Sequence, residues 1–341
     1  MLRPRVKPTH RPRRLAGGRI RVGPVSLPDP GSRLWALLDL LDGTRTTAQI
    51  VDAVAPRFLT PHAALSALDR IIATGCVEDA AAPVPAELSD RDLERYSRSQ
   101  AYFSSVDVKP RDSNWHAQVR LRTAKVVVVG VGGIGGSAAL ALATSGVGRL
   151  HLIEPGAVEL SDLNRQILYM EYDLGLPKVD VAVDRLQEYN SDISITGWRS
   201  TVTGPGMLAD LVEGYDLLIM TASRPLVRSW AGQACRKAGI PWVYGRYSGP
   251  LVTTGVYSSS DGPCYDCEEN VAGGDLVAPQ SANAVSAGMA GLRVAHVAMG
   301  ILTGVPAVAV NRTYVMNLVD PGNVAVLTAD ERRDDCPTCA G

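Results

Sequence analysis

The sequence predicts an α/β protein in which a doubly wound, mostly parallel sheet follows a small winged-helix-like domain. Short β-branched runs such as 125–129 alternate with amphipathic stretches from residue 87 onward, the pattern of crossover connections in a parallel sheet. A glycine-rich turn at 130–136 follows the first of these runs. The chain has 341 residues, more than one domain usually holds, and a Pro/Ala-rich linker lies at 79–90.

We therefore expect two domains, residues 1–82 and 83–341. Hydrophobic residues make up 46% of the chain, which excludes a wholly disordered protein. The net charge of −1 argues against nucleic-acid binding as the main role. The N-terminus lacks the apolar run of a signal peptide, and the charge-free stretch 126–148 is typical of a buried strand and a glycine turn. We predict a cytoplasmic protein without a membrane partner.

The first domain is expected to contain short strands followed by helices. Residues 19–27 alternate weakly, as short strands do. Apolar residues at helical spacing predict helices at 30–41 and 61–74, and Thr46 or Thr47 could cap a helix that runs to Ala53. The segment 1–28 contains no acidic residue and many arginines. This basic arm would favour an acidic partner.

This domain resembles the PqqD-like peptide-recognition module of ribosomal-peptide biosynthesis. The resemblance lies in Leu-Leu-Asp-Gly-Thr at 40–44, the short helix after it, and Gly-Cys-Val at 75–77. It implies that a strand edge and a neighbouring helix bind the leader of a precursor peptide, whose backbone satisfies the free strand-edge amides. The alternative is a winged helix that only packs on the second domain or binds nothing.

The second domain reads as alternating strands and helices, which places its motifs at strand ends. Strands are expected at 125–129, 150–153, 215–220 and 241–244, and helices at 137–145, 177–189 and 225–238. The glycines are Gly130, Gly132, Gly133 and Gly135. They let backbone amides approach phosphate in a Rossmann-like turn, and Glu154 ends the next strand, where an acid can bind ribose hydroxyls. Alone, these features describe an NAD-dependent dehydrogenase equally well.

The segment after Glu154 separates the two interpretations. Asn164, Arg165 and Gln166 follow the second strand, and Lys178 opens the next helix. A dehydrogenase needs no cations there, because the glycine turn already holds its pyrophosphate. An enzyme that attacks the α-phosphate of ATP needs them to neutralise the developing charge.

Over about residues 87–320 the sequence resembles the ThiF/MoeB/HesA adenylyltransferases, the family that includes ubiquitin-activating enzymes. The shared motifs are Glu-Leu-Ser-Asp at 87–90, Arg-Tyr-Ser-Arg at 95–98, the glycine turn at 130–135, Leu-Asn-Arg-Gln at 163–166, Gly-Leu-Pro-Lys at 175–178, and Arg228. The resemblance implies an enzyme in which a peptide C-terminal carboxylate attacks ATP to give an acyl-adenylate and pyrophosphate. It implies that Asn164, Arg165, Gln166 and Lys178 contact the phosphates or ribose, and that Glu154 takes the ribose role.

Two further residues carry implications from this family. Arg98 matches an arginine that reaches into the partner subunit's site, which implies a homodimer. The position of the family's Mg²⁺-binding Asp aligns with Ser223, and serine is a poor ligand beside a carboxylate. Water-mediated coordination, a substitute acid or a lapsed activity would each account for the change.

Cysteines form two Cys-x-x-Cys pairs, Cys264 with Cys267 and Cys336 with Cys339. Four thiolates at this spacing would close a tetrahedral, structural Zn²⁺ site. Disulfides within each pair or redox motifs are the alternatives, which the expected cytosolic location disfavours. The segment 268–283 contains no cysteine. Thioester-forming relatives have their nucleophile about there, so we expect the reaction to stop at the adenylate or to use a non-sulfur nucleophile.

The two-part layout resembles microcin C-type peptide-adenylating enzymes and predicts a ribosomal-peptide tailoring enzyme. The first domain would hold the leader while the second activates a carboxylate with ATP and Mg²⁺. The competing hypothesis, supported by Ser223, is a weakened scaffold that presents the precursor to a partner cyclodehydratase or another tailoring enzyme. A sulfur-carrier activator is a third option, although such proteins need no leader-binding domain.

Overall fold

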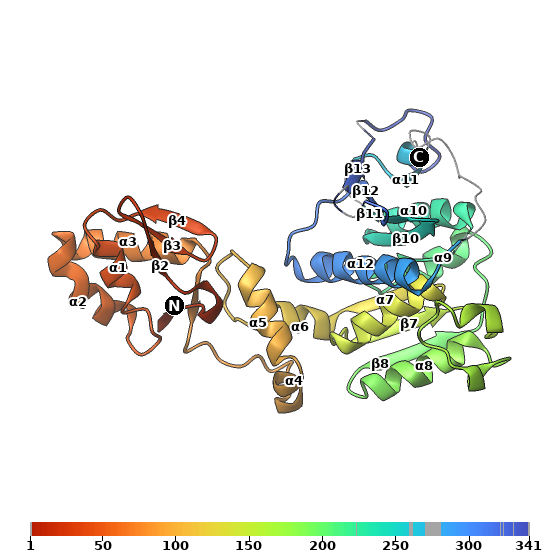
Figure 1. Cartoon of the computed structure of the whole chain (residues 1–341), viewed down its shortest axis with the longest axis horizontal. Helices are drawn as coiled ribbons and strands as arrows, with labels where there is room; N and C mark the ends of the chain where they lie inside the picture. The colour runs from red at the N-terminus through yellow and green to blue at the C-terminus, as the bar shows by residue number, and fades with distance from the viewer. Residues whose placement is uncertain are drawn as a thin grey trace. The chain divides into compact units, whose positions relative to one another are not determined.

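The computed structural model describes residues 2–222, 224–258, 262–269, 281–320, 322, 324–329 and 331–339. The chain divides into two compact units, Met1–Arg120 and Leu121–Gly341. Figure 1 labels the elements of both units.

The first unit contains a three-stranded antiparallel sheet and a small helical core. The sheet has the order β2-β3-β4. Buried side chains of β3 and of three helices form one apolar cluster that includes Ile20, Leu37, Ile50 and Leu68. Thr46 caps the second of these helices, as one of the two predicted options had it. The elements are β1 (Pro4–Val6), β2 (Arg13–Leu15), β3 (Arg19–Val22), β4 (Val25–Pro28), α1 (Arg33–Leu38), α2 (Thr47–Phe58), α3 (Pro61–Ala73), β5 (Val77–Asp79), α4 (Asp90–Arg95), α5 (Ser97–Val106) and α6 (His116–Thr123).

The segment 83–120 belongs to this first unit, whereas the predicted domain boundary lies at residue 82. Polar contacts tie α5 and the loop after it to the N-terminal arm. Lys7 Nζ donates a hydrogen bond to the carbonyl of Asp107 at 2.7 Å, and the His10 ring contacts the carbonyl of Ser105 at 2.9 Å. A proline-rich linker can therefore be followed by residues that pack back onto the preceding domain. The functional boundary at residue 82 stays a prediction.

The second unit is built on one sheet, as predicted. In the described residues its order is β13-β12-β11-β10-β9-β6-β7-β8. The five strands from β10 to β8 are parallel, and β11, β12 and β13 add antiparallel pairs at one edge. The strands are β6 (Lys125–Val129), β7 (Arg149–Ile153), β8 (Ser194–Trp198), β9 (Leu217–Met220), β10 (Trp242–Ser248), β11 (Leu251–Tyr257), β12 (Arg312–Asn317) and β13 (Val324–Leu327).

Helices of this unit connect and cover the strands. They are α7 (Gly133–Thr144), α8 (Lys178–Tyr189), α9 (Pro205–Val212), α10 (Pro225–Ala238), α11 (Tyr265–Glu269) and α12 (Ala284–Thr303). The chain winds from β6 outward to β8 and then returns to the other side of β6 as β9. Strand order thus reverses between β6 and β9, and a crevice at such a point is where doubly wound sheets bind their ligands.

The turn from β6 into α7 depends on two glycines. Gly130 has φ +90°, a conformation that side chains rarely adopt. A Cβ on Gly135 would lie 1.8 Å from the carbonyl oxygen of Gly130. The backbone of Gly135 therefore lies in van der Waals contact with that of Gly130. This contact holds the first amides of α7 directly beyond the end of β6.

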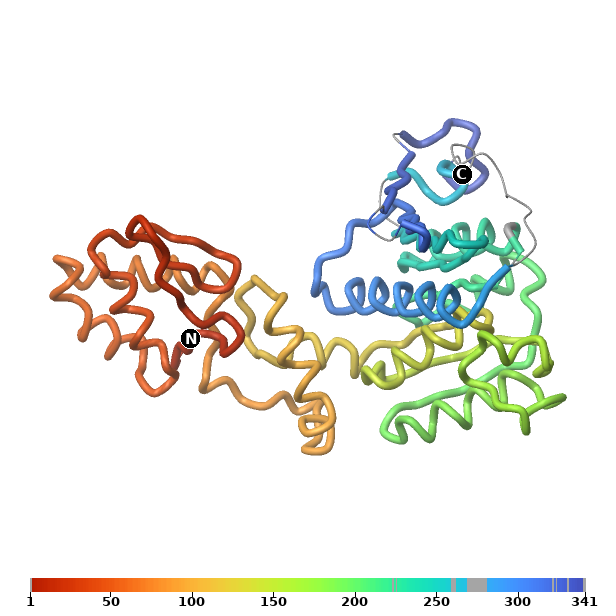
Figure 2. The backbone as a smooth tube through the Cα atoms, in the orientation of Figure 1, coloured from red at the N-terminus to blue at the C-terminus, as the bar shows by residue number. Residues whose placement is uncertain are grey.

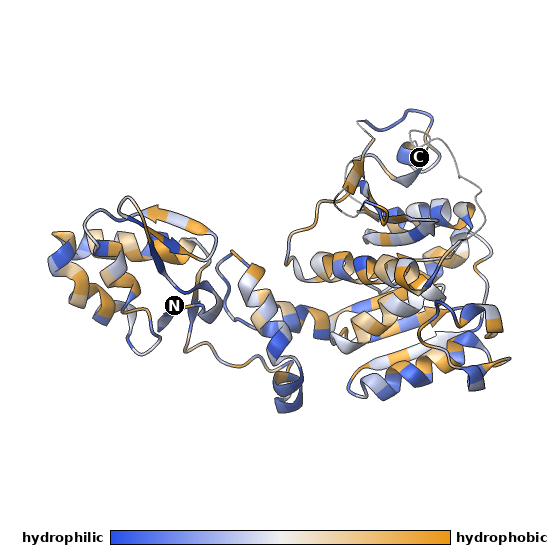
Figure 3. Ribbon diagram, viewed as in Figure 1, coloured by the Kyte–Doolittle hydropathy of each residue, from blue (hydrophilic) through white to orange (hydrophobic). Residues whose placement is uncertain are grey.

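Helix α12 is long and apolar enough to cross a membrane by length and composition alone. Here it lies alongside α7, from which it is far removed in sequence (Figure 2). A Cβ on Gly291 of α12 would lie 2.4 Å from the carbonyl oxygen of Ile134 on α7. Figure 3 shows how much of both helices is hydrophobic. This close packing is typical of a core helix, and the cytoplasmic location stays a prediction.

Candidate nucleotide site and cysteine cluster

A cavity of about 640 Å³ opens at the carboxyl ends of the parallel strands in the second unit. The last residues of β6 and β7, together with Thr221 just beyond β9, line it beside the glycine turn. Further lining comes from the ends of α10 and β10. The cavity therefore lies at the point where strand order reverses. The predicted site residues that line it are Gly130, Gly132, Gly133, Gly135, Glu154, Arg165 and Gln166.

Buried polar contacts hold the glycine turn in place. The carboxylate of Glu154 accepts hydrogen bonds from the amides of Val131 at 3.1 Å and Gly156 at 2.9 Å. The hydroxyl of Tyr169 donates to the carbonyl of Val131 at 2.8 Å. Burial raises the pKa of Tyr169 far above its usual value, so this donor keeps its proton at any physiological pH. Glu154 thus shapes the turn as well as lining the cavity.

Asp162 is the centre of a charged cluster beside the cavity. It is 5% exposed, and Lys178 Nζ lies 2.8 Å from its Oδ2. Arg165 Nη2 lies 3.7 Å from Oδ1, and the amide of Gln166 donates to the same oxygen. One buried carboxylate therefore contacts three of the side chains that the sequence assigns to phosphate or ribose, those of Arg165, Gln166 and Lys178. A buried ion needs such partners to offset its lost hydration.

Gln166 leaves one acceptor available at the cavity wall. Its Nε2 is bound to Asp162, but its Oε1 is buried and has no hydrogen-bond partner. Buried polar atoms without partners are rare in native proteins. A hydroxyl or amine of a bound nucleotide would satisfy this oxygen. The glycine turn, the helix N-terminus and this acceptor fit a nucleotide in the cavity.

Other predicted residues lie away from the cavity wall. Asn164 is exposed and accepts a hydrogen bond from Arg165 Nη1 at 2.9 Å. Lys178 contacts Asp162 rather than the cavity. Arg98 is exposed on α5 of the first unit. Ser223 lies outside the described residues, as does the 270–280 part of the cysteine-free segment, while Ala222 and Arg224 on either side of Ser223 line the cavity.

Sequence reasoning missed Asp162, Tyr169 and Arg246, the last of which lines the cavity from β10. Asp162 could have been found, because Arg165 and Gln166 follow it at spacings of three and four residues, which place side chains together in a helical turn. Tyr169 and Arg246 carry no comparable signal, since their positions follow from how distant segments pack.

The carboxylates in and beside the described part of the cavity already have hydrogen-bond or ion-pair partners. Glu154 is the one acidic residue among its described lining residues, and both its oxygens accept backbone amides. Asp162 is paired with Lys178. Mg²⁺ prefers carboxylate and water oxygens in octahedral geometry. Carboxylates of the described lining therefore do not by themselves supply an octahedral Mg²⁺ site, and phosphate and water oxygens would have to complete it.

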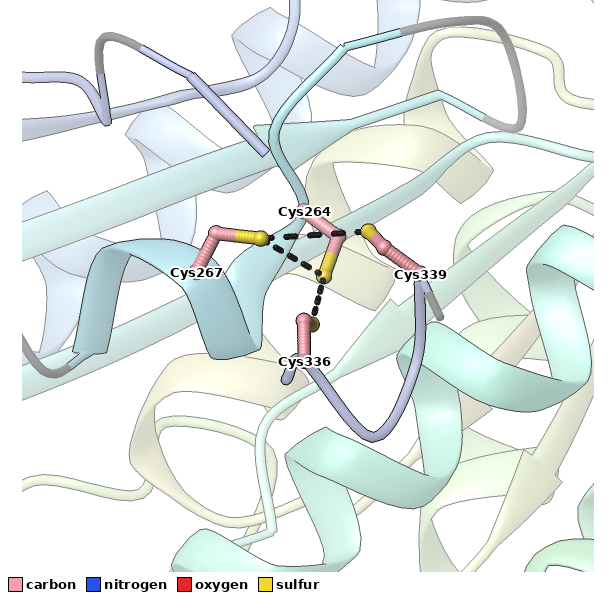
Figure 4. A group of neighbouring side chains, drawn as sticks. All are labelled: Cys264, Cys267, Cys336 and Cys339. Carbon is pink, nitrogen blue, oxygen red and sulfur yellow. Dashed lines mark hydrogen bonds between the residues drawn. The ribbon is translucent and has the colours of Figure 1, made fainter. Parts of the chain in front are cut away.

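The four predicted cysteines converge (Figure 4). All their sulfur atoms lie within 4.8 Å of one another. Cys264 Sγ is 3.5 Å from Cys336 Sγ and 3.8 Å from Cys267 Sγ, and Cys267 Sγ is 3.8 Å from Cys339 Sγ. A disulfide requires about 2.05 Å, so the cysteines are free thiols. Tetrahedral zinc with bonds of about 2.3 Å separates its sulfur ligands by about 3.8 Å, which fits this cluster.

Polar contacts around the cluster join it to α10. The carboxylate of Asp266 accepts hydrogen bonds from Ser229 on α10 and from Thr338 between the second pair of cysteines. Arg236 of α10 lies 3.9 Å from Cys339 Sγ and places a positive charge beside the thiols. Such outer partners orient metal ligands.

The parallel sheet, the glycine turn and the lined cavity define a nucleotide-binding α/β protein. Residues 97–338 match the ThiF family. The chain therefore belongs to the ThiF family.

Adenylyltransferases match about half of this chain. The molybdopterin-synthase adenylyltransferase of Escherichia coli K12 is 34% identical over 186 residues, which cover 53% of this chain and 70% of that protein. The adenylyltransferase and sulfurtransferase MOCS3 of Culex quinquefasciatus is 35% identical over 184 residues, covering 53% of this chain and 39% of that protein. The chain thus spans well under half the length of the MOCS3 protein that it matches.

Solved structures of E. coli MccB share the fold of the whole chain. MccB with ATP has a TM-score of 0.79 at 18% identity, covering 99% of both chains. The microcin C7 biosynthetic enzyme MccB in complex with N-formylated MccA has a TM-score of 0.76 at 19% identity, covering 98% of this chain and 99% of that chain. At these identities the likeness establishes the fold.

Replacing Asp162 by Asn should destabilise the protein by about 2–4 kcal/mol at neutral pH, because Lys178 then keeps a mostly buried charge without its partner. Denaturant unfolding measures the change. Asp184→Asn on the exposed side of α8 is the matched control and should change stability by less than about 0.5 kcal/mol. Adding Lys178→Met to Asp162→Asn should recover part of the loss, and equal effects of the two Asp substitutions would contradict a buried pair.

Proposed function

We propose that this chain uses ATP to adenylate a carboxylate, the C-terminal one, of a ribosomally synthesised precursor peptide in peptide natural product biosynthesis. The observation that carries the proposal is the cavity at the reversal of strand order, lined by the glycine turn and by Arg165 and Gln166 of the adjoining Asp162 cluster. Membership of the ThiF family supports it, as does the shared fold with MccB, whose structures include complexes with ATP and with N-formylated MccA.

The reaction would transfer AMP to the peptide. A carboxylate oxygen attacks the α-phosphorus, the bond from this phosphorus to the bridging oxygen breaks, and pyrophosphate leaves. Amides at the start of α7 would hold the phosphates, and Arg165 would offset the charge that develops on them. Asp162 holds Arg165 and Lys178 in fixed positions, so the charges are arranged before the substrate arrives.

The first domain, residues 1–82, is proposed to bind the leader of that precursor. Its three-stranded sheet has two edge strands, β2 and β4, and an extended peptide can pair with such an edge. The mode is the one expected of a PqqD-like module.

The proposed activity is tested by ATP–pyrophosphate exchange with synthetic peptides encoded by short reading frames beside the gene. Exchange should occur in the presence of Mg²⁺ and fall by about 10²–10³ in Lys178→Ala, the loss typical of one preorganised electrostatic partner. Ser223→Asp should raise the rate by restoring a carboxylate. ATP binding without exchange in the native chain, but with exchange in Ser223→Asp, would indicate a lapsed activity. Neither binding nor exchange in either form would favour the scaffold that serves a partner tailoring enzyme.

We also propose a homodimer in which Arg98 of each chain completes the site of the other. Arg98 is exposed on α5, so its side chain is accessible to a second copy. Arg98→Ala and Lys178→Ala should each lose most of the activity, while a mixture should regain part of it because one site of each mixed dimer keeps both residues. A monomer in sedimentation analysis, or an inactive mixture, would refute the arrangement.

The cysteine cluster is proposed to hold structural Zn²⁺ through Cys264, Cys267, Cys336 and Cys339. Purified protein should contain about one zinc per chain, and chelation should lower the Tm because a structural metal contributes folding free energy. Mass spectrometry and thiol titration measure the zinc content, and thermal unfolding with and without chelator measures the Tm. Cys235→Ser, at a buried cysteine outside the cluster, should leave the zinc content unchanged. Metal-free protein with all four thiols reactive would contradict the site.

A further inference from the structure

The antiparallel sheet of the first unit has one buried face and one solvent face. Ile20 and Val22 of β3 are buried in the apolar core, whereas Arg19 and Arg21, which alternate with them along the strand, are exposed. Side chains of a strand alternate between faces. The two arginines therefore project from the solvent face.

The pairing register adds more residues to this face. Arg13 of β2 lies directly opposite Arg21, and Leu15 lies opposite Arg19. On the other side, β4 contributes residues opposite the same two arginines. We call this surface the arginine face; it consists of Arg13, Leu15, Arg19, Arg21, Ser26 and Pro28. Figure 3 shows the hydrophilic character of β2 and β3.

Arg14 of β2 is an arginine of this sheet whose side chain already has partners within the domain. It belongs to the opposite face, because its partner across the strands is the buried Ile20. Its guanidinium lies 4.4 Å from the centre of the Trp35 ring and donates a hydrogen bond to Ser32. These contacts within the domain account for Arg14. In the described residues, Arg13 and Arg21 of the arginine face have no such contact.

Within the described part of the first unit, no carboxylate forms an ion pair with Arg13, Arg19 or Arg21. The first acidic residue of the chain, Asp29, is buried, and its two oxygens accept the amides of Leu34 and Trp35 at the start of α1. It cannot also neutralise the face. Residues directly opposite in antiparallel strands have Cα atoms about 4.5–5.5 Å apart, and like charges there repel.

One arginine is already held in position. Arg19 donates to the hydroxyl of Ser26 at 3.2 Å and to the carbonyl of Ser26 at 3.1 Å. These bonds fix its guanidinium across β4, so less conformational entropy would be lost when it binds an anion. A guanidinium also matches a carboxylate with two parallel hydrogen bonds.

We propose that the arginine face binds an acidic segment of the peptide substrate. Arg19 and Arg21 are two residues apart on one strand, about 6.6–6.8 Å, which is the spacing of alternate side chains in an extended peptide. Acidic residues at alternate positions of an extended segment would therefore meet the arginines. The identity of the partner as a peptide rests on the proposed function. The face contains no aromatic side chain of the kind on which single-stranded nucleic acids stack.

The test uses the full chain and a fluorescently labelled peptide of alternating Thr and Glu, with an alternating Thr and Gln peptide as its neutral match. Fluorescence anisotropy should show binding of the acidic peptide, at least about tenfold weaker binding of the neutral one, and weakening with added salt. Arg13→Gln combined with Arg21→Gln should weaken acidic-peptide binding by about tenfold or more. Arg57→Gln combined with Arg70→Gln, exposed on α2 and α3, should leave it unchanged.

Three outcomes would overturn the proposal. These are equal binding of the two peptides, equal loss in the two double variants, and tighter binding of a labelled oligonucleotide that displaces the acidic peptide. The Tm of Arg13→Gln with Arg21→Gln should not fall, because the substitutions remove a repulsion. Failure of the proposed function has a different signature: the acidic peptide binds as expected, and ATP–pyrophosphate exchange is absent.

Discussion

The close passage of backbone between Gly130 and Gly135 is the constraint on which the second unit depends. It lets the chain leave β6 and enter α7 with no side chain in the way, so the first helical amides face the end of the sheet. The reversal of strand order between β6 and β9 places a cavity at that point. Thr221 reinforces the arrangement, because its hydroxyl donates to the carbonyl of Gly130 from beyond β9 at 2.8 Å.

Electrostatic organisation follows from this geometry. The cavity wall contains amide donors and cations, and the buried Asp162 beside it is paired with Arg165 of the wall and with Lys178. The same carboxylate would reduce the net attraction for phosphate, since it offsets part of the positive charge. The site therefore favours fixed geometry over maximal charge, which suits a reaction whose charge appears on oxygens only as bonds change.

The sequence foretold the central strands closely, because β-branched runs such as 125–129 and proline-started helices such as 225–238 have strong local signals. Strand β8 and the antiparallel strands β11 to β13 were not anticipated, since their stability comes from neighbouring strands rather than from pattern. In the candidate site, the predicted glycines, Glu154, Arg165 and Gln166 line one cavity, and their roles in binding or catalysis stay predictions. Asp162 was missed although its spacing from Arg165 and Gln166 carries a local signal, whereas the spatial division at residue 120 carries none and the Pro/Ala-rich linker lies earlier in the chain.

Because α12 comes late in the sequence, the second unit is exposed to aggregation while it folds. Its partner α7 is synthesised much earlier, so α7 keeps an apolar surface without cover until α12 is made. Contacts between segments so distant in sequence form slowly, and surfaces left open meanwhile invite association with other chains. Gly291 makes the packing of α12 on α7 sensitive to substitution, because a Cβ at this position would clash with α7. The yield of soluble protein in a cell should therefore depend on how well this surface is protected during synthesis.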